Sequence, residues 1–267
     1  MNSVSKSESS QVLVSIITVV YNGASTLEQT IQSVLNQTYQ NIEYIIIDGG
    51  STDGTLEIIK KYENKIALWV SEPDNGLYDA MNKGIHKATG KLIGMINSDD
   101  WYESNAVTLA VEAYRNNPQK KIFHGDRFDV DKKEKKKIYK FNNSKLKLFY
   151  SAMTYNHPSM FVHQDIYKKF KYNTSLKAYS DYEFVLSNYL LNKNNFQYIP
   201  EPYVNYRTDG LSYKISLFTN ISEGSTARLN AGLNYQHVLV FACVKIFQAT
   251  LINIFGNQTL RNLGLIQ

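Results

Sequence analysis

Four short apolar runs alternate with helical patterns over the first hundred residues, and this alternation limits the folds that the chain can adopt. The runs span residues 12–21, 43–48, 67–71 and 92–97. Short runs rich in β-branched residues are typical of strands that are buried on both faces. Because a helical pattern separates each run from the next, the sequence predicts an α/β fold with a mostly parallel central sheet and flanking helices.

The second part of the chain is more mixed. We expect helices over residues 104–116 and 181–192, strands over 121–126 and 159–163, and short strands around Pro200 and Pro202. From about residue 214 the pattern is helical without strands. We therefore predict a flexible tail over 1–11, a main domain over 12–213 with halves 12–103 and 104–213, and a helical extension over 214–267.

Polar, glycine-rich or acidic residues follow each of the four predicted strands. Tyr21 follows the first, residues 48–51 follow the second, residues 72–76 the third, and Asp99 and Asp100 the fourth. The carboxyl ends of parallel strands meet at one edge of a sheet, and ligands of open α/β sheets bind beyond that edge. The sequence therefore predicts a binding site formed by these loops.

Two adjacent acids, Asp99 and Asp100, close the fourth strand in the segment INSDDWYES. One interpretation is structural, because aspartate is a favoured N-cap for a following helix. The other is functional, because carboxylate oxygens at a strand end can hold Mg²⁺ or Mn²⁺, which in turn binds phosphates. Two aspartates alone leave both interpretations open.

The loop IDGGSTDGT, residues 47–55, carries a second signal. Gly49 and Gly50 allow the backbone to approach a ligand closely or to turn with positive φ. Asp48, at the end of a buried strand, can accept hydrogen bonds from a base or a ribose. The alternative is a plain connection between strand and helix in which Asp53 caps the helix.

These segments together resemble glycosyltransferase family 2. The resemblance rests on VSIITVVYNGASTLEQTIQSVLNQTYQNIEYIIIDGGSTDGT and SEPDNGLYDAMNKGIHKATGKLIGMINSDD, and it extends from residue 12 to about residue 212. It implies the GT-A fold of nucleotide-diphospho-sugar transferases. On this basis residues 12–103 would form the nucleotide-binding half and residues 104–213 the acceptor half of the catalytic domain.

The resemblance implies roles for individual residues on the donor side. Tyr21 would lie against the donor's base, and Asp48 would lie near the base and the ribose. Asp79, Asn82 and Lys83 would border the donor from a helix that faces the cleft, and Lys83 would pair with the diphosphate.

The acid pair matches the place of the family's DXD-type motif. There Asp99 and Asp100 would contact ribose, metal and sugar, with Asp100 as the preferred direct ligand of Mn²⁺ or Mg²⁺. Two departures from the family pattern stand out. Gly49 replaces a second acid that contacts the base in many members, and Asn97 replaces the first acid of the usual Asp-x-Asp-Asp.

The resemblance also places a catalytic base in AYSDYEFVLSNY, residues 178–189, where Asp181 matches the base position and Glu183 is the fallback. The structural alternative for Asp181 is an N-cap of the helix that follows. His157, in YNHPSMFV, would meet the diphosphate or the metal. Arg207, in YRTDGLS, would reach the diphosphate from a flexible loop, or would instead pair with a surface acid.

The function implied is inverting transfer of a sugar from a nucleotide diphosphate donor, with a UDP-sugar favoured, to a glycan, glycoconjugate or lipid-linked acceptor. A carboxylate would take the proton of the attacking hydroxyl, and a divalent cation would assist. Two alternatives are a nucleotidyltransferase of sugar phosphates and a non-catalytic scaffold that keeps the fold. The loop after the first strand lacks the basic residues of a nucleotidyltransferase, and the intact acids argue against a scaffold.

Composition adds few constraints. The formal net charge of +5 suits nucleotide diphosphates, anionic lipid surfaces or nucleic acid alike, although the resemblance implies no nucleic acid partner. Cys243 is the only cysteine, which excludes an intrachain disulfide and favours a reducing compartment. The polar start lacks the apolar region of a secretory signal. We therefore expect a cytoplasmic location, including the inner face of the membrane.

The helical extension is the ambiguous part of the chain. We expect no membrane span, because the nearest apolar stretch, residues 238–255, is interrupted by polar residues. Its apolar side chains could pack on the main domain, form a homo-oligomer or lie in a membrane interface. Lysines in residues 132–137 predict a solvated hairpin tip, or a contact with anionic lipid.

Overall fold

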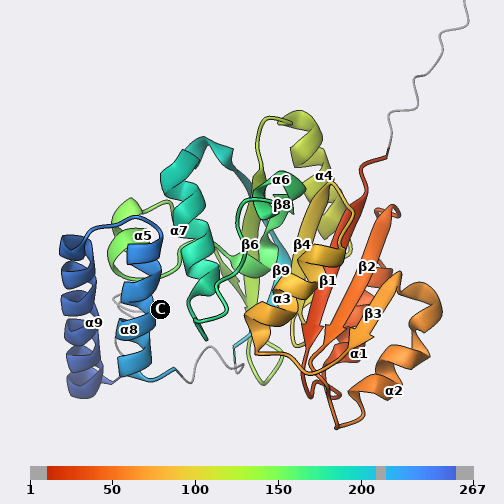
Figure 1. Ribbon diagram of the computed structural model, residues 1–267, viewed down its shortest axis with the longest axis horizontal. Helices are drawn as coiled ribbons and strands as arrows, with labels where there is room; N and C mark the ends of the chain where they lie inside the picture. Colours follow the sequence, from red (N-terminus) through yellow and green to blue (C-terminus); the bar gives the residue numbers. More distant parts are fainter. Residues whose placement is uncertain (1–10, 209–214, 257–267) are drawn as a thin grey trace, which may run out of the picture.

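The computed structural model describes residues 11–208 and 215–256 (Figure 1). The predicted flexible tail therefore lies outside the described residues except for Gln11, and so does the predicted domain boundary at residues 213 and 214. Within the described residues, nine strands form one sheet in the order β3-β2-β1-β4-β8-β6-β9-β5, with β7 paired to β6. The chain is thus α/β, as the alternation of strand and helix patterns predicts.

The first four strands run parallel, which confirms the prediction for the first hundred residues. They are β1 (Val14–Val20), β2 (Ile42–Asp48), β3 (Leu68–Ser71) and β4 (Leu92–Asn97). The connecting helices are α1 (Leu27–Leu35), α2 (Thr55–Lys61) and α3 (Leu77–Lys87), with a short 3-10 turn, η1 (Glu63–Lys65), before β3. Successive side chains of a strand point to opposite faces. Ile16 and Ile17 accordingly belong to two different apolar cores, one on each face of the sheet.

The rest of the sheet is mixed. It contains β5 (Trp101–Tyr102), β6 (Ile122–Val130), β7 (Lys136–Tyr139), β8 (Phe161–His163) and β9 (Phe196–Arg207). The two short strands predicted around Pro200 and Pro202 are in fact one strand, β9, whose pairing with β6 shifts register opposite Gly125 and Asp126. Proline cannot donate to a strand ladder, so these irregularities absorb it without ending the strand.

The remaining helices are α4 (Ala106–Asn116), α5 (Lys145–Tyr150), α6 (Gln164–Tyr167), α7 (Ser180–Asn192), α8 (Leu217–Asn230) and α9 (Tyr235–Phe255). Two further 3-10 turns are η2 (His157–Ser159) and η3 (Lys193–Asn195). The lysine-rich turn between β6 and β7 is a hairpin tip, as predicted. The predicted helical extension is present as α8 and α9, which lie at the end of the molecule opposite α2 (Figure 1).

The expectation that no segment could span a membrane is wrong by the criteria of length and composition. Among the described residues, α9 is the one helix that is long and apolar enough to do so, and 6% of its most apolar window is buried. Its single lysine and its few amide side chains leave the mean hydropathy of its most apolar window at 2.0, which is high enough for a membrane span. Helix α9 packs along α8 and α5 on one side only.

Candidate active site

The loops that follow the first four strands meet at one edge of the sheet, as predicted. Asp48 at the end of β2 lies opposite Val20 of β1 and Ser71 of β3. Hydrogen bonds then join the loops, because the amide of Asn22 donates to Ser51 Oγ at 2.7 Å and Thr52 N donates to the side chain of Asn22 at 2.9 Å. The loops after β1 and β2 therefore form one polar rim at this edge.

Tyr21 and Asp48 occupy very different environments on this rim. Tyr21 is 66% exposed and offers an aromatic face to solvent, whereas Asp48 is fully buried. The Asp48 carboxylate accepts hydrogen bonds from the amides of Gly50 and Ser51 and from the hydroxyls of Ser51 and Ser71. Three of these four bonds go to Oδ2, and one, from the Ser51 hydroxyl, goes to Oδ1. Asp48 thus fixes the loop that follows β2, and its expected place near the base and the ribose stays a prediction.

The acid pair after β4 has an unusual electrostatic environment. Asp100 is 1% exposed, and its Oδ1 accepts a hydrogen bond from the amide of Arg207 at 3.0 Å. Its Oδ2 is buried without a hydrogen-bond partner among the described residues. Burial, reinforced by the neighbouring charge of Asp99, raises the pKa of Asp100 well above its usual range. Because the helix that follows, α4, begins only at Ala106, neither acid is the N-cap of that helix.

Arg207 lies beside this pair, but not in the flexible loop that the sequence predicted. It is the last residue of β9, and its Nη2 donates to Gln29 of α1 at 2.6 Å. Its guanidinium lies over the ring of Trp101 at 4.9 Å, and Glu134 lies 3.8 Å from Nη1. Arg207 is thus a fixed positive charge next to the acid pair, held there by α1 and β5.

A second cluster surrounds Asp181 in the first turn of α7. Oδ1 of Asp181 accepts hydrogen bonds from the Tyr78 hydroxyl at 3.1 Å and from the amide of Tyr182 at 2.8 Å. Tyr78 stacks on Tyr172, whose hydroxyl lies 2.6 Å from Nε2 of His157. Burial lowers the pKa of His157, an effect that the negative charge of Asp181 partly opposes. The imidazole is therefore neutral at neutral pH.

The structure separates the two acids that were predicted as possible bases. Asp181 is partly exposed and is not the N-cap of α7, since that position belongs to Tyr179. Glu183 instead accepts hydrogen bonds from Asn173 at 3.2 Å and from Asn230 of α8 at 2.9 Å. Glu183 thus joins α7 to α8, which leaves Asp181 as the acid that faces the tyrosine cluster.

The three predicted residues of α3 already contact other parts of the chain. Asp79 accepts a hydrogen bond from the amide of Asn75 at 3.0 Å, and Lys83 donates to the carbonyl of Pro73 at 3.1 Å, both in the loop that follows β3. Asn82 exchanges two hydrogen bonds with the backbone of Tyr172, at 2.8 and 3.0 Å. Lys83 pairs with Glu72 at 2.8 Å and lies 3.8 Å from Asp79. The structure therefore gives Asn82 a role in positioning the Tyr172 loop, and the charge of Lys83 is already compensated.

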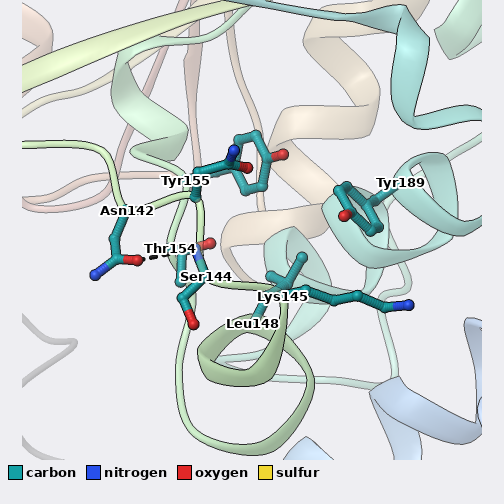
Figure 2. Close-up of a pocket in the computed structure, with 8 residues that line it drawn as sticks. Asn142, Ser144, Lys145, Leu148, Thr154, Tyr155 and Tyr189 are labelled. Carbon is teal, nitrogen blue, oxygen red and sulfur yellow. Dashed lines mark hydrogen bonds between the residues drawn. The ribbon is translucent and has the colours of Figure 1, made fainter.

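These α3 residues also line a groove of about 490 Å³ that extends toward α6. The other side chains and backbone around it come from Ile85, His86, Ala88, Ile93, Gln164, Tyr167, Lys168 and Lys171. A second hollow lies between α5 and α7 (Figure 2), and it is too small to hold a water molecule. None of the predicted site residues lines that second hollow, so it is not the candidate active site.

Sequence reasoning missed the residues that organise the two clusters. Tyr78 directly precedes Asp79 in the quoted segment, but nothing in its spacing indicates a contact with a residue a hundred positions later. Tyr172 carries no motif at all. Trp101 follows the acid pair, and only the pairing of β5 with β9 places it against Arg207.

The acid pair has the chemistry of a cation site. The described residues contain no group of three or more His, Cys, Asp or Glu side chains arranged around a metal position. Mg²⁺ and Mn²⁺, however, are commonly held by one or two carboxylates together with water and substrate phosphates. The buried Oδ2 of Asp100 has no hydrogen-bond partner among the described residues, and the charge of Asp99 repels that of Asp100. A cation bound here would coordinate this oxygen and offset the repulsion.

Comparison with known sequences identifies the family. The sequence model of glycosyl transferase family 2 matches residues 15–173. An uncharacterized glycosyltransferase of Mycobacterium tuberculosis is 44% identical over 102 residues, which are 38% of this chain and 39% of that protein. The chondroitin synthase of Pasteurella multocida is 39% identical over 104 residues, which are 38% of this chain and 11% of that protein. The matched segments therefore span less than half of these relatives.

Solved structures agree on the fold. S. aureus TarS, residues 1–349 in complex with UDP-GlcNAc, superposes with a TM-score of 0.69 at 16% identity, covering 93% of this chain and 77% of that one. The mannosyltransferase PcManGT of Pyrobaculum calidifontis, in complex with GDP-Man and Mn²⁺, gives 0.63 at 15% identity, covering 88% and 70%. The fold is thus GT-A, and with the family match over more than half of its length, the chain belongs to glycosyl transferase family 2.

Proposed function

We propose that this protein transfers a sugar, with inversion, from a nucleotide diphosphate donor to a hydroxyl group of a glycan, glycoconjugate or lipid-linked acceptor. The observation that carries the proposal is the environment of Asp181. Its carboxylate is partly exposed and is oriented by the Tyr78 hydroxyl at 3.1 Å and by the amide of Tyr182 at 2.8 Å. A general base must be oriented toward the proton that it abstracts and lie within hydrogen-bond reach of it.

In the proposed reaction the acceptor oxygen attacks C1 of the donor sugar from the face opposite the diphosphate. The bond between C1 and the diphosphate oxygen breaks, and the acceptor hydroxyl's proton passes to Asp181. His157 stays neutral and fixes Tyr172 at 2.6 Å, and Tyr172 in turn supports the ring of Tyr78. His157 is thus a positioning residue in this scheme, and not a ligand of the diphosphate.

On the donor side, Tyr21 offers an exposed ring against which a base can stack. Asp99 and Asp100 would hold a divalent cation, Mn²⁺ or Mg²⁺, which when bound neutralises the charge of the leaving diphosphate. Arg207 stands next to this pair as a fixed cation. A UDP-sugar is the donor that we favour, in keeping with the UDP-GlcNAc complex of TarS. We place the reaction in the cytoplasm, at the inner face of the membrane.

A donor panel tests this proposal. The full chain is titrated with UDP-, GDP- and dTDP-sugars in the presence of Mn²⁺, and binding and slow donor hydrolysis are both measured. We expect one nucleotide class to bind, and a chelator to abolish hydrolysis. Release of pyrophosphate from a nucleoside triphosphate and a sugar phosphate would instead identify a nucleotidyltransferase. Absence of any nucleotide-sugar binding would leave only a scaffold role.

A further inference from the structure

The outer face of α9 is apolar and open to solvent. Leu239 is 66% exposed, Phe247 62% and Ile254 64%. The same face continues through Tyr235, Val240, Ile246 and Phe255, each at least 45% exposed. Contiguous apolar surface of this extent marks an interaction site.

The width of this face indicates what covers it. At about 100° per residue, the exposed apolar positions of α9 spread over roughly 200° of the helix circumference. A second helix covers an apolar stripe of only about 100°. A second copy of this chain that packed its own α9 here would thus leave much of the face in water, whereas the interfacial region of a bilayer can surround it.

The charges near α9 also suit a membrane. The sequence has no Asp or Glu among residues 224–267, and none between Glu134 and Asp165, a stretch with six lysines. That stretch includes α5, which packs against α9 through Tyr150 stacked on His237 and a hydrogen bond from Gln248 to Ser151 at 3.2 Å. Leu146, 71% exposed, lies between Lys145 and Lys147. Basic residues beside exposed apolar ones favour anionic lipid.

Contacts on the inner side of α9 keep it on the protein. Phe241 is fully buried, and the Arg228 guanidinium lies over its ring at 3.4 Å. A β-carbon at Gly224 of α8 would lie 2.6 Å from Phe241, so the two helices approach as closely as a glycine allows. A helix that crossed the bilayer would have to abandon these contacts, which favours a helix that lies along the surface.

We propose that the outer face of α9, with the lysines and Leu146 of α5, binds the surface of a membrane that contains anionic phospholipid. The helix lies parallel to the bilayer, with its apolar side chains among the acyl chains and the α5 lysines at the headgroups. This arrangement holds the GT-A domain at the lipid surface. It is independent of the chemistry proposed above, since it concerns lipid binding and not sugar transfer.

The test uses the full chain and sedimentation with vesicles made of phosphatidylglycerol and phosphatidylcholine in equal parts. The wild type should bind these vesicles, bind pure phosphatidylcholine less, and lose affinity as salt rises. The double variant Leu239→Gln and Phe247→Gln should lower partitioning about tenfold or more, because two apolar side chains no longer leave water. Leu191→Gln is the matched control, since Leu191 is also 66% exposed but lies on α7.

A charge pair completes the design. Lys145→Glu should weaken binding to the anionic vesicles, whereas Lys60→Glu, the same change on α2 at the far end of the molecule, should not (Figure 1). Circular dichroism checks that each variant is folded. The proposal is overturned if the wild type binds neither vesicle or if the controls lose as much binding as the test variants. It is also overturned if light scattering shows a dimer that the double variant separates, or if alkaline carbonate fails to release the protein from vesicles.

Discussion

The carboxylate of Asp74 occupies the space that a side chain at Gly49 would fill. A β-carbon built at Gly49 would lie 2.5 Å from Oδ2 of Asp74. Asp74 is held in place because its Oδ1 accepts a hydrogen bond from the amide of Gly76 at 2.8 Å. The resemblance to the family implies a base-contacting acid at position 49 in many members. Here a carboxylate from the loop after β3 stands at that place instead.

Gly49→Ala should therefore weaken binding of the donor nucleotide. The added methyl group displaces the Asp74 carboxylate, since a contact of this length between non-bonded atoms is not tolerated. We expect the Kd for UDP, measured by calorimetry, to rise about tenfold, which corresponds to about 1.4 kcal/mol. The double variant Gly49→Asp with Asp74→Gly, which moves the carboxylate from one loop to the other, should recover most of this affinity. Unchanged UDP binding in Gly49→Ala would show that Asp74 has no part in the donor site.

Asp181→Asn should abolish transfer without abolishing donor binding. The amide can still accept a hydrogen bond from Tyr78 but cannot take a proton, so kcat should fall by about 10²–10⁴-fold. The Kd for the donor should stay within about twofold. Glu183→Gln is the matched control, because Glu183 lies two residues away and bonds only to Asn173 and Asn230 among the described residues. If Glu183→Gln lost as much activity as Asp181→Asn, the base would be misassigned.

The strand ends could be predicted from the sequence because they depend on local pattern. Apolar runs and loop composition place Tyr21, Asp48 and the acid pair at one edge, and the register of β1 with β2 and β4 brings them there. The orientation of each side chain could not be predicted. Asp48 is held by the hydroxyl of Ser51 in the following loop and by that of Ser71 at the end of β3. Arg207 is fixed by the pairing of β5 with β9, which no sequence motif indicates.

Asp100→Asn should raise the melting temperature at neutral and alkaline pH. Burial and the charge of Asp99 raise the pKa of Asp100, so the folded protein holds this proton more tightly than the unfolded chain does. The contribution of this group to stability is therefore fully present below the unfolded pKa of about 4 and is lost as pH rises through the folded value. Asparagine cannot ionise. The melting temperature of Asp100→Asn should therefore exceed that of the wild type as the pH rises above about 4, and the two should be equal at lower pH.

The same variant tests the cation site. Mn²⁺ should raise the melting temperature of the wild type at pH 8, because it relieves the repulsion within the acid pair, and it should have little effect on Asp100→Asn. Each kcal/mol gained corresponds to about 2–4 °C for a chain of this size. If Asp100→Asn melted below the wild type at pH 8 without metal, the raised pKa would not be a source of strain.

Arg228 should contribute to stability through its packing and not through its charge. It is fully buried and lies between the rings of Tyr182 and Phe241, and its Nε donates to the Phe149 carbonyl at 2.7 Å. Its Nη2 has no partner, and no carboxylate of the described chain pairs with it. Burying an unpaired charge is costly, and apolar residues of similar volume often replace such groups without loss.

Arg228→Ala should accordingly lower the free energy of unfolding by about 3 kcal/mol, because it leaves a cavity between two rings and an unpaired carbonyl. Arg228→Met keeps most of the volume and removes the desolvated charge, so it should cost less than half as much. Urea unfolding followed by circular dichroism gives both values. Equal losses in the two variants would mean that the guanidinium's hydrogen bond to Phe149, and not its packing, holds α8 against α5.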